Sequence, residues 1–193
     1  MSLLGIISGT ILLKDISEGL EEVTVETPFG AARLMRGSKV AYIARHGTDP
    51  GCPILPHIIN HPANLCALKQ LGVRDVVAAN STGSLKRNLK PGMLAVPGDF
   101  IALEATPTAC QGKAVHITPA LSEKMRTELL ESAREVNAPV EDGGVYWQTS
   151  GPRLETRAEI AMMSQFADLV GMTMAGEAIV AQELGLEYAA ICS

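Results

Sequence analysis

The feature that most constrains the fold is a repeated alternation of short apolar runs with longer amphipathic segments. The apolar runs have the length and composition of buried strands, and they occupy residues 3–7, 40–44, 73–79, 93–96, 145–149, 169–172 and 186–192. Stretches with helical spacing of apolar residues lie between several of them, at 62–71, 119–136, 157–166 and 175–184. Strands that alternate with helices favour an α/β fold, in which a largely parallel, twisted central sheet is flanked by helices.

A chain of 193 residues can bury one sizeable core, so we expect a single domain over residues 1–193. The last predicted strand, 186–192, runs into the end of the sequence with no following element to cover it. Buried strands need cover on both faces, and natural chain ends are usually polar and exposed. These observations predict that the domain lacks its C-terminal part.

Net charge and cysteine spacing argue against several classes of function. The formal charge is −5, whereas broad nucleic-acid binding needs a basic surface. The four cysteines lie far apart and share no metal-ligand spacing with the four histidines, which predicts free thiols and no metal site. No apolar stretch approaches the ~18 residues of a membrane span, and no signal peptide is recognisable. We therefore expect a cytoplasmic protein without nucleic-acid or membrane partners.

Polar residues directly follow several predicted strands, where the ligands of parallel sheets bind. Ser8, Gly9 and Thr10 follow the first strand and could cradle an anion, although a plain turn would have the same composition. Arg45 and His46 follow the strand at 40–44. An arginine offers a planar fork of donors to phosphate; the alternatives are a surface salt bridge for Arg45 and packing for His46.

Three later segments occupy equivalent positions. The run 80–84 consists of small polar residues that would let a ligand approach the backbone, and the alternative is a plain loop. The segment 148–159 places Glu155 near the start of a helix, where the carboxylate could contact a ligand or merely cap the helix. Met172 and Thr173 end the strand at 169–172. A hydroxyl there could reach a phosphate or a sugar, and the alternative is a core methionine with a helix cap.

In combination, these segments resemble the trimeric purine-nucleoside phosphorylase family, which includes the methylthioadenosine and methylthioinosine phosphorylases. The resemblance runs from Gly5 to Ser193 and implies the fold of that family, a pentosyltransferase activity and a homotrimer. It rests on Arg45-His46-Gly47, Gly151-Pro152-Arg153 with Arg157-Ala158-Glu159, Gly171-Met172-Thr173, and the proline-histidine-asparagine segment 56–60 followed by Ala63-Asn64.

The resemblance also implies roles for individual residues. Phosphate would be bound by Ser8, Gly9, Thr10, Arg45, His46, Ser81 and Thr173. The nucleoside would contact Asn80, Thr82, Ser150, Gly151, Leu154, Glu155, Met172, His57 and His116. Met172 would lie against the ribose, and His116 would approach the 5′ group of a nucleoside in a neighbouring subunit. The residue that supports the departing purine at N7 follows the last strand in the family and is expected beyond Ser193.

Three features depart from the family pattern. The first loop reads Ser-Gly-Thr instead of Gly-Gly-Ser or Gly-Gly-Thr. A second histidine near Arg45-His46-Gly47 is missing. Leu154 replaces an aromatic residue, which would weaken stacking on the purine.

The expected reaction is phosphorolysis of a purine nucleoside or a 5′-methylthio purine nucleoside, giving free base and a sugar 1-phosphate. Inorganic phosphate is the co-substrate, and no cofactor is expected. Glu155 favours 6-oxopurines, because their N1–H can donate to a carboxylate whereas N1 of adenine would be repelled. His116 favours a methylthio group at the 5′ position, so methylthioinosine satisfies both features.

Alternative functions remain open at this level. They are a methylthioadenosine phosphorylase, an inactive nucleoside-binding protein of the same fold, and a nucleosidase that uses water. A nucleosidase would not need an arginine at the phosphate position, and an inactive protein would have lost the phosphate ligands, which are present at Thr10, Arg45, Ser81 and Thr173.

Overall fold

The structure is a computed structural model and describes residues 3–9, 19–104 and 106–193. The helical elements in these ranges are the 3-10 turn η2 (Pro56–Ile58), α2 (His61–Gln70), α3 (Glu123–Glu135), α4 (Arg157–Met163) and α5 (Met174–Glu183). None of the helices in this described part of the chain is long and apolar enough to cross a membrane. The strands are β1 (Leu4–Ser8), β2 (Glu21–Thr27), β3 (Gly30–Arg36), β4 (Val40–Ala44), β5 (Asp75–Asn80), β6 (Gly83–Ser84), β7 (Leu94–Val96), β8 (Asp99–Ile101), β9 (Val140–Asp142), β10 (Val145–Gln148), β11 (Leu169–Gly171) and β12 (Glu187–Cys192).

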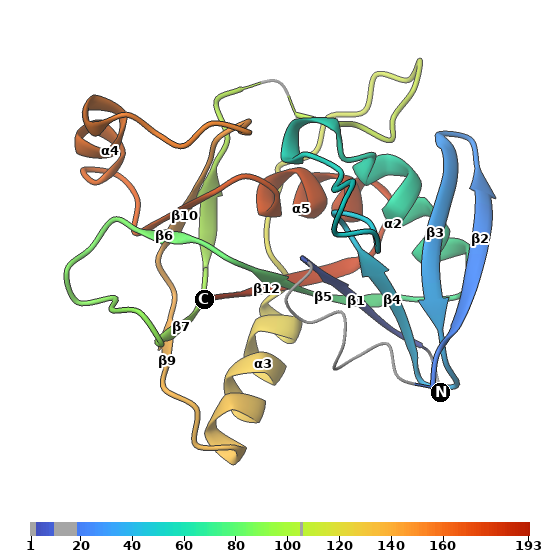
Figure 1. Cartoon of the computed structure of the whole chain (residues 1–193), viewed down its shortest axis with the longest axis horizontal. Helices are drawn as coiled ribbons and strands as arrows, with labels where there is room; N and C mark the ends of the chain where they lie inside the picture. The colour runs from blue at the N-terminus through green and yellow to red at the C-terminus, as the bar shows by residue number, and fades with distance from the viewer. Residues whose placement is uncertain (1–2, 10–18, 105) are drawn as a thin grey trace.

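An eight-stranded sheet forms the centre of the molecule, in the order β2-β3-β4-β1-β5-β12-β7-β9. Its middle strands β4, β1, β5 and β12 all run parallel, so their carboxyl ends meet at one edge. Helices α2 and α5 cover one face of this sheet and α3 covers the other (Figure 1). The predicted α/β fold, with a largely parallel sheet flanked by helices, is confirmed.

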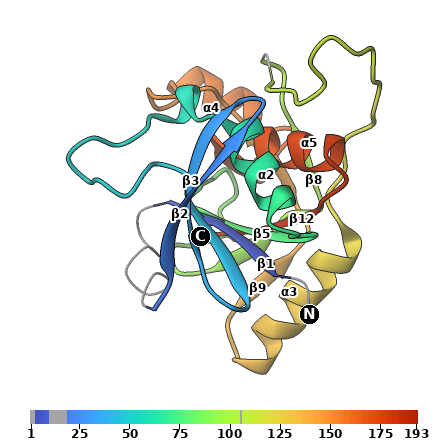
Figure 2. The same cartoon turned by 90° about the vertical axis from the view of Figure 1, so that its right-hand side faces the viewer.

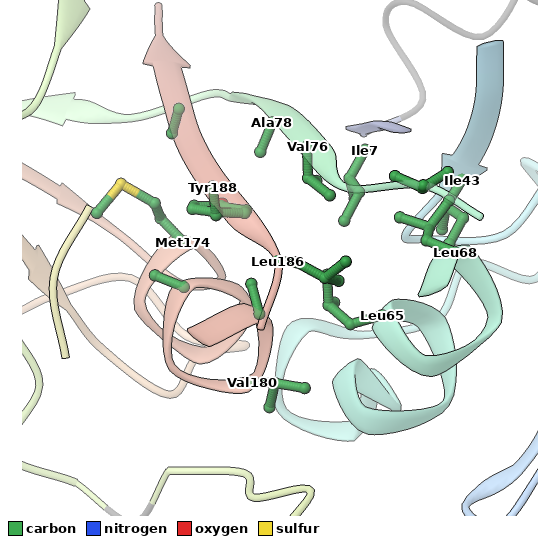
Figure 3. Close-up of a cluster of buried hydrophobic side chains, with 14 of the residues drawn as sticks. Ile7, Ile43, Leu65, Leu68, Val76, Ala78, Met174, Val180, Leu186 and Tyr188 are labelled. Atoms are coloured by element: carbon green, nitrogen blue, oxygen red, sulfur yellow. The ribbon is translucent and has the colours of Figure 1, made fainter. Parts of the chain in front are cut away.

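The main core lies between the central sheet and the helices α2 and α5. Ile7 of β1 and Val76 of β5 point towards Leu65 and Leu68 of α2 (Figure 3). Eight of the ten residues of α5 are buried, because this helix packs against both β12 and α2. Burial of apolar surface contributes ~25 cal/mol per Å², so this layer is the main source of stability. Glu177 is the charged residue within the buried run of α5.

A second sheet of four strands, in the order β6-β11-β10-β8, lies beside the first. Strands β8, β10 and β11 run parallel to one another. The predicted strands at 145–149 and 169–172 therefore belong to this smaller sheet and not to the central one. At Gly171, the last residue of β11, the backbone approaches Tyr146 so closely that a Cβ atom would collide with the tyrosine hydroxyl.

Several element ends differ from the predicted ones. The helix expected from residue 119 begins at Glu123, because the hydroxyl of Ser122 caps it by accepting the N–H of Met125. The hairpin β2–β3 and the short strands β6, β8 and β9 were not predicted. Strands β2 and β3 pair at the edge of the sheet (Figure 2). Exposed residues alternate with partly buried ones in β2 and with buried ones in β3, so neither strand has the continuous apolar run of a strand buried on both faces.

Candidate active site

Strands of both sheets end around one cavity of about 500 Å³. Strands β1, β4 and β5 of the central sheet, and β11 of the second sheet, supply residues at or just after their carboxyl ends. A cavity of this size lies within the range of small-molecule sites, roughly 300–1,000 Å³. It is lined by Gly9, Arg45, His46, Pro56, Ser81, Thr82, Gly83, Leu154, Glu155, Val170, Gly171, Met172 and Thr173.

Nine of the predicted site residues line this cavity, although they come from distant parts of the sequence. A smaller cavity of about 180 Å³ shares Gly9 and Ser81 with the large one, and it adds Ser8 and Asn80. The nine residues on the large cavity are Gly9, Arg45, His46, Ser81, Thr82, Leu154, Glu155, Met172 and Thr173.

The other predicted residues lie elsewhere. Ser150 lines two neighbouring cavities of about 220 and 260 Å³, the first together with Gly151 and the second together with His57. His116 lies on an exposed loop and lines none of these four cavities of its own chain. Thr10 lies outside the described residues, so the structure says nothing of its predicted contact with phosphate.

Arg45 is held from several sides at the end of β4, and its side chain is 3% exposed. Its Nε donates to Oε1 of Glu177 at 2.7 Å, and its Nη2 donates to Oε2 at 3.2 Å. Nη1 donates to the carbonyl of Ala79 at 2.8 Å, and Nη2 also donates to the carbonyl of Ile7 at 3.2 Å. The alternative of a surface salt bridge is therefore wrong. The pair of donors Nε and Nη2, one of the forks through which an arginine can bind phosphate, donates to the carboxylate of Glu177 instead.

Glu177 accepts a further hydrogen bond on Oε2, the oxygen that also accepts from Nη2 of Arg45. The hydroxyl of Tyr188, on β12, donates to its Oε2 at 2.8 Å. His61, at the start of α2, places its Nδ1 3.9 Å from Oε1 of Glu177. All of these side chains are buried, and Nδ1 of His61 has no hydrogen-bond partner among the described residues. A carboxylate in this position compensates the buried charge of Arg45.

Thr173 lines the large cavity, and its hydroxyl does not cap the helix that it precedes. It is the N-cap residue of α5, yet its side chain makes no capping hydrogen bond. Its Oγ1 accepts a hydrogen bond from Nδ2 of Asn80 at 2.9 Å. Because the oxygen is already an acceptor there, the hydroxyl hydrogen is left to donate to a ligand. The alternative reading of Thr173 as a plain helix cap is wrong.

The N-terminus of α5 is capped by two side chains of β10. The hydroxyl of Tyr146 accepts the N–H groups of Thr173 and Met174, at 3.3 and 3.5 Å. Oε1 of Gln148 accepts those of Ala175 and Gly176, at 2.7 and 3.1 Å. The first backbone donors of this helix are therefore occupied. An anion in the cavity would have to be bound by groups other than this helix N-terminus.

Ser8 and His46 each form hydrogen bonds with other residues of the protein. The hydroxyl of Ser8 contacts Oη of Tyr42 at 2.7 Å and donates to the carbonyl of Gly9 at 2.8 Å. Nδ1 of His46 lies 2.8 Å from the carbonyl of Ile54, so it must carry the hydrogen. In the neutral ring this leaves Nε2 as an acceptor, which suits a sugar hydroxyl. His46 can donate to phosphate from Nε2 only when its ring is protonated.

Glu155 faces the cavity from the segment between β10 and α4. Its Oε1 accepts a hydrogen bond from Oγ1 of Thr149 at 2.7 Å, and the carboxylate lines the large cavity. The N-terminus of α4 is capped by Thr156 and Glu159, which form a reciprocal capping box. The alternative that Glu155 merely caps this helix is therefore wrong, and its second oxygen is available to a ligand.

Five residues of the site were missed by the analysis of the sequence. Gln148 and Thr149 belong to the segment 148–159 that had been singled out, but no role was assigned to them. Tyr146 lies in the predicted strand at 145–149, and its expected role was structural. Glu177 had a visible signal, because an acidic residue within an otherwise apolar helix needs a buried partner. Nothing in the sequence pointed to Tyr188, because tyrosine is a common residue in buried strands.

Burial lowers the pKa of His61 from 6.5 to about 4, against the opposing effect of Glu177 and with smaller contributions from Arg45 and His46. The unfolded chain takes up this proton below pH 6.5, whereas the folded protein resists it until about pH 4. The stability associated with neutral His61 is thus present above pH 6.5 and is lost as the pH falls towards 4. The total loss is about 3 kcal/mol.

We expect the free energy of unfolding to fall between pH 6.5 and 4.5 more steeply in the wild type than in His61→Gln. Urea titrations at several pH values measure this difference. His116→Gln, which alters an exposed histidine, is the control and should retain the slope of the wild type. Equal slopes for all three proteins would contradict the prediction.

Comparison with known proteins shows what the chain resembles. Residues 4–193 match the family model described as the phosphorylase superfamily. A probable 6-oxopurine nucleoside phosphorylase of Archaeoglobus fulgidus is 45% identical over 99% of this chain and 80% of its own length. A probable S-methyl-5′-thioinosine phosphorylase of Methanocaldococcus jannaschii is 40% identical over 99% of the chain and 77% of its length.

A solved structure is similar over the whole chain. It is a variant of the adenosine/methylthioadenosine phosphorylase of Schistosoma mansoni in complex with methylthioadenosine. The TM-score is 0.87 with 28% sequence identity, and the match covers 100% of this chain and 79% of the other.

Proposed function

The chain belongs to the phosphorylase superfamily, and we propose that it is a purine-nucleoside phosphorylase. The reaction transfers the ribosyl or 5-methylthioribosyl group of a purine nucleoside to inorganic phosphate. One observation carries the proposal: anion donors on Arg45 and Thr173 and the carboxylate of Glu155 line a single cavity of about 500 Å³. That volume suits a nucleoside beside a phosphate.

The chemistry follows from the charges that develop. The bond between C1′ and N9 breaks with its electron pair moving to the purine, and a phosphate oxygen forms a new bond to C1′. Positive charge grows on the sugar, and a phosphate held by Arg45 and Thr173 would stabilise it while it attacks. Met172 would lie against the ribose. The purine gains negative charge and needs a partner at N7, for which we assign no described residue. Phosphate is the co-substrate, and the proposal invokes no cofactor.

The base preference that we propose is for 6-oxopurines. Oε1 of Glu155 is engaged by Thr149, which leaves the other carboxylate oxygen to accept N1–H of hypoxanthine or guanine. The relatives named as 6-oxopurine and methylthioinosine phosphorylases support this preference. The second candidate is a methylthioadenosine phosphorylase, which the similar structure with bound methylthioadenosine favours.

The remaining assignments are also proposals. We infer a homotrimer in which His116 completes the nucleoside site of a neighbour, since His116 is exposed and lines none of the four cavities described above in its own chain. Sedimentation of the purified protein measures the oligomeric state. Mixing Arg45→Ala and His116→Ala subunits should restore activity if the site is shared. A self-sufficient monomer would exclude this arrangement.

We expect release of hypoxanthine from methylthioinosine or inosine only when inorganic phosphate is present, with sugar 1-phosphate formed in equal amount. Chromatography of both products measures the reaction. Cleavage at the same rate without phosphate would indicate a nucleosidase. Binding of nucleoside without any cleavage would indicate an inactive binding protein, and either result would overturn the proposal.

A further inference from the structure

We propose that Glu177 is a positioning residue for phosphate use: it orients the guanidinium of Arg45 so that one N–H group is fixed for the anion. The inference rests on the proposed function, because it assigns phosphate to the large cavity. Its basis is the buried contact between α5 and the loop after β4, which joins residues 132 positions apart.

The hydrogen-bond inventory of Arg45 shows what remains for a ligand. A guanidinium has five N–H groups. Two are taken by the carboxylate of Glu177 and two by the carbonyls of Ile7 and Ala79. Among the described residues, the remaining N–H belongs to Nη1, and Arg45 lines the large cavity. Arg45 can therefore offer phosphate one N–H group of fixed direction instead of a fork.

Glu177 is itself fixed, which makes it suitable for this role. It is 1% exposed and accepts hydrogen bonds from Nε and Nη2 of Arg45 and from the hydroxyl of Tyr188. Its helix is locked between β12 and α2, and the N-terminus of that helix is capped by Gln148 and Tyr146. Because Glu177 is held in place, it also fixes the orientation of the Arg45 side chain, which is the one proposed to contact phosphate.

Two roles for Glu177 predict effects of opposite sign. If it served only as a counter-charge, neutralising it would leave Arg45 with an uncompensated positive charge, and phosphate would bind more tightly. If it orients Arg45, neutralising it by Glu177→Gln releases the guanidinium. Nε and Nη2 donate to different carboxylate oxygens, and glutamine replaces one of these acceptors with an NH₂ donor. The N–H group meant for the anion then loses its direction, and phosphate binds more weakly.

We expect Glu177→Gln to raise the KM for phosphate and the Kd of inorganic phosphate about tenfold or more, with the KM for the nucleoside changed less than threefold. Steady-state kinetics and calorimetry with inorganic phosphate measure these constants. Tyr188→Phe removes one support of the carboxylate while leaving the ion pair, so a rise of about threefold is expected. This second variant keeps the test available if Glu177→Gln does not fold.

Asp142→Asn is the matched control. Asp142 pairs with Arg126, another buried arginine, at 2.7 Å and outside the cavity. The Asp142 carboxylate is exposed and Arg126 also pairs with Glu123, so loss of this carboxylate should change the melting temperature little and leave the phosphate constants unchanged. An unchanged or lower phosphate KM in both Glu177→Gln and Tyr188→Phe would overturn the inference, as would an equal rise in Asp142→Asn. Wild-type protein that binds phosphate but does not cleave nucleosides would refute the proposed function alone, since calorimetry still tests Glu177.

Discussion

Replacing Arg45 with alanine is expected to raise the KM for phosphate about a hundredfold or more, while the KM for the nucleoside changes less than threefold. The variant loses a charge-assisted hydrogen bond to the anion, worth about 1.5–3 kcal/mol. It also leaves the buried carboxylate of Glu177 without its ion-pair partner, 2.7 Å from where Nε of Arg45 stood. That uncompensated negative charge would repel phosphate further. Steady-state kinetics with each substrate varied in turn measures both constants.

The same substitution should also destabilise the protein, because breaking a buried ion pair from one side costs about 3–5 kcal/mol. Stability and phosphate use can be separated by the double variant Arg45→Met with Glu177→Met. Removing both charges should restore at least half of the lost stability, while the phosphate KM stays high. Recovery of phosphate use in the double variant, or an equal loss of nucleoside affinity in Arg45→Ala, would contradict the assignment of Arg45.

The fold could be predicted because its central strands are buried on both faces and therefore appear as continuous apolar runs. The hairpin β2–β3 could not, since it pairs at a sheet edge and carries glutamates and arginines on its exposed positions. The division of the strands into two sheets could not be predicted from the sequence either. An apolar run predicts a strand, but it does not identify the strand's neighbours, and β10 pairs with β8 and β11 instead of with the central sheet.

The candidate site was predictable in composition but not in hydrogen bonding. Nine of the residues predicted for the site line one cavity, in part because parallel strands present their carboxyl ends at one edge. The sequence could not show that Glu177 occupies the fork of Arg45, since these residues come from elements far apart along the chain. Nor could it show that Tyr146 and Gln148 occupy the backbone donors of α5. Such contacts depend on tertiary packing.

Thr149 gives the proposed base preference a structural basis that the sequence lacked. Its hydroxyl donates to Oε1 of Glu155, which fixes the rotation of the carboxylate within the cavity wall. A glutamine at position 155 would accept the same hydrogen bond with its amide oxygen. Its NH₂ group would then occupy the place of the second carboxylate oxygen, and a donor would face the purine where an acceptor stood.

We therefore expect the wild type to cleave methylthioinosine at least about a hundredfold more efficiently than methylthioadenosine, and Glu155→Gln to cancel or reverse this ratio. A donor at that position pairs with the lone pair on N1 of adenine and opposes the N1–H of hypoxanthine, and an unpaired buried polar group costs about 1–3 kcal/mol on each substrate. The measurement is kcat/KM for both nucleosides at saturating phosphate.

Thr149→Val combined with Glu155→Gln provides the control. Without the threonine hydroxyl the amide can rotate and present either its oxygen or its NH₂ group, so the two substrates should be cleaved with efficiencies within about threefold of each other. Glu155→Gln should leave the phosphate KM unchanged, because the proposed site places this carboxylate against the base and not against the anion. A wild type that prefers methylthioadenosine would refute the role of Glu155 and favour the methylthioadenosine phosphorylase. An unaltered ratio in Glu155→Gln would place base recognition on another residue.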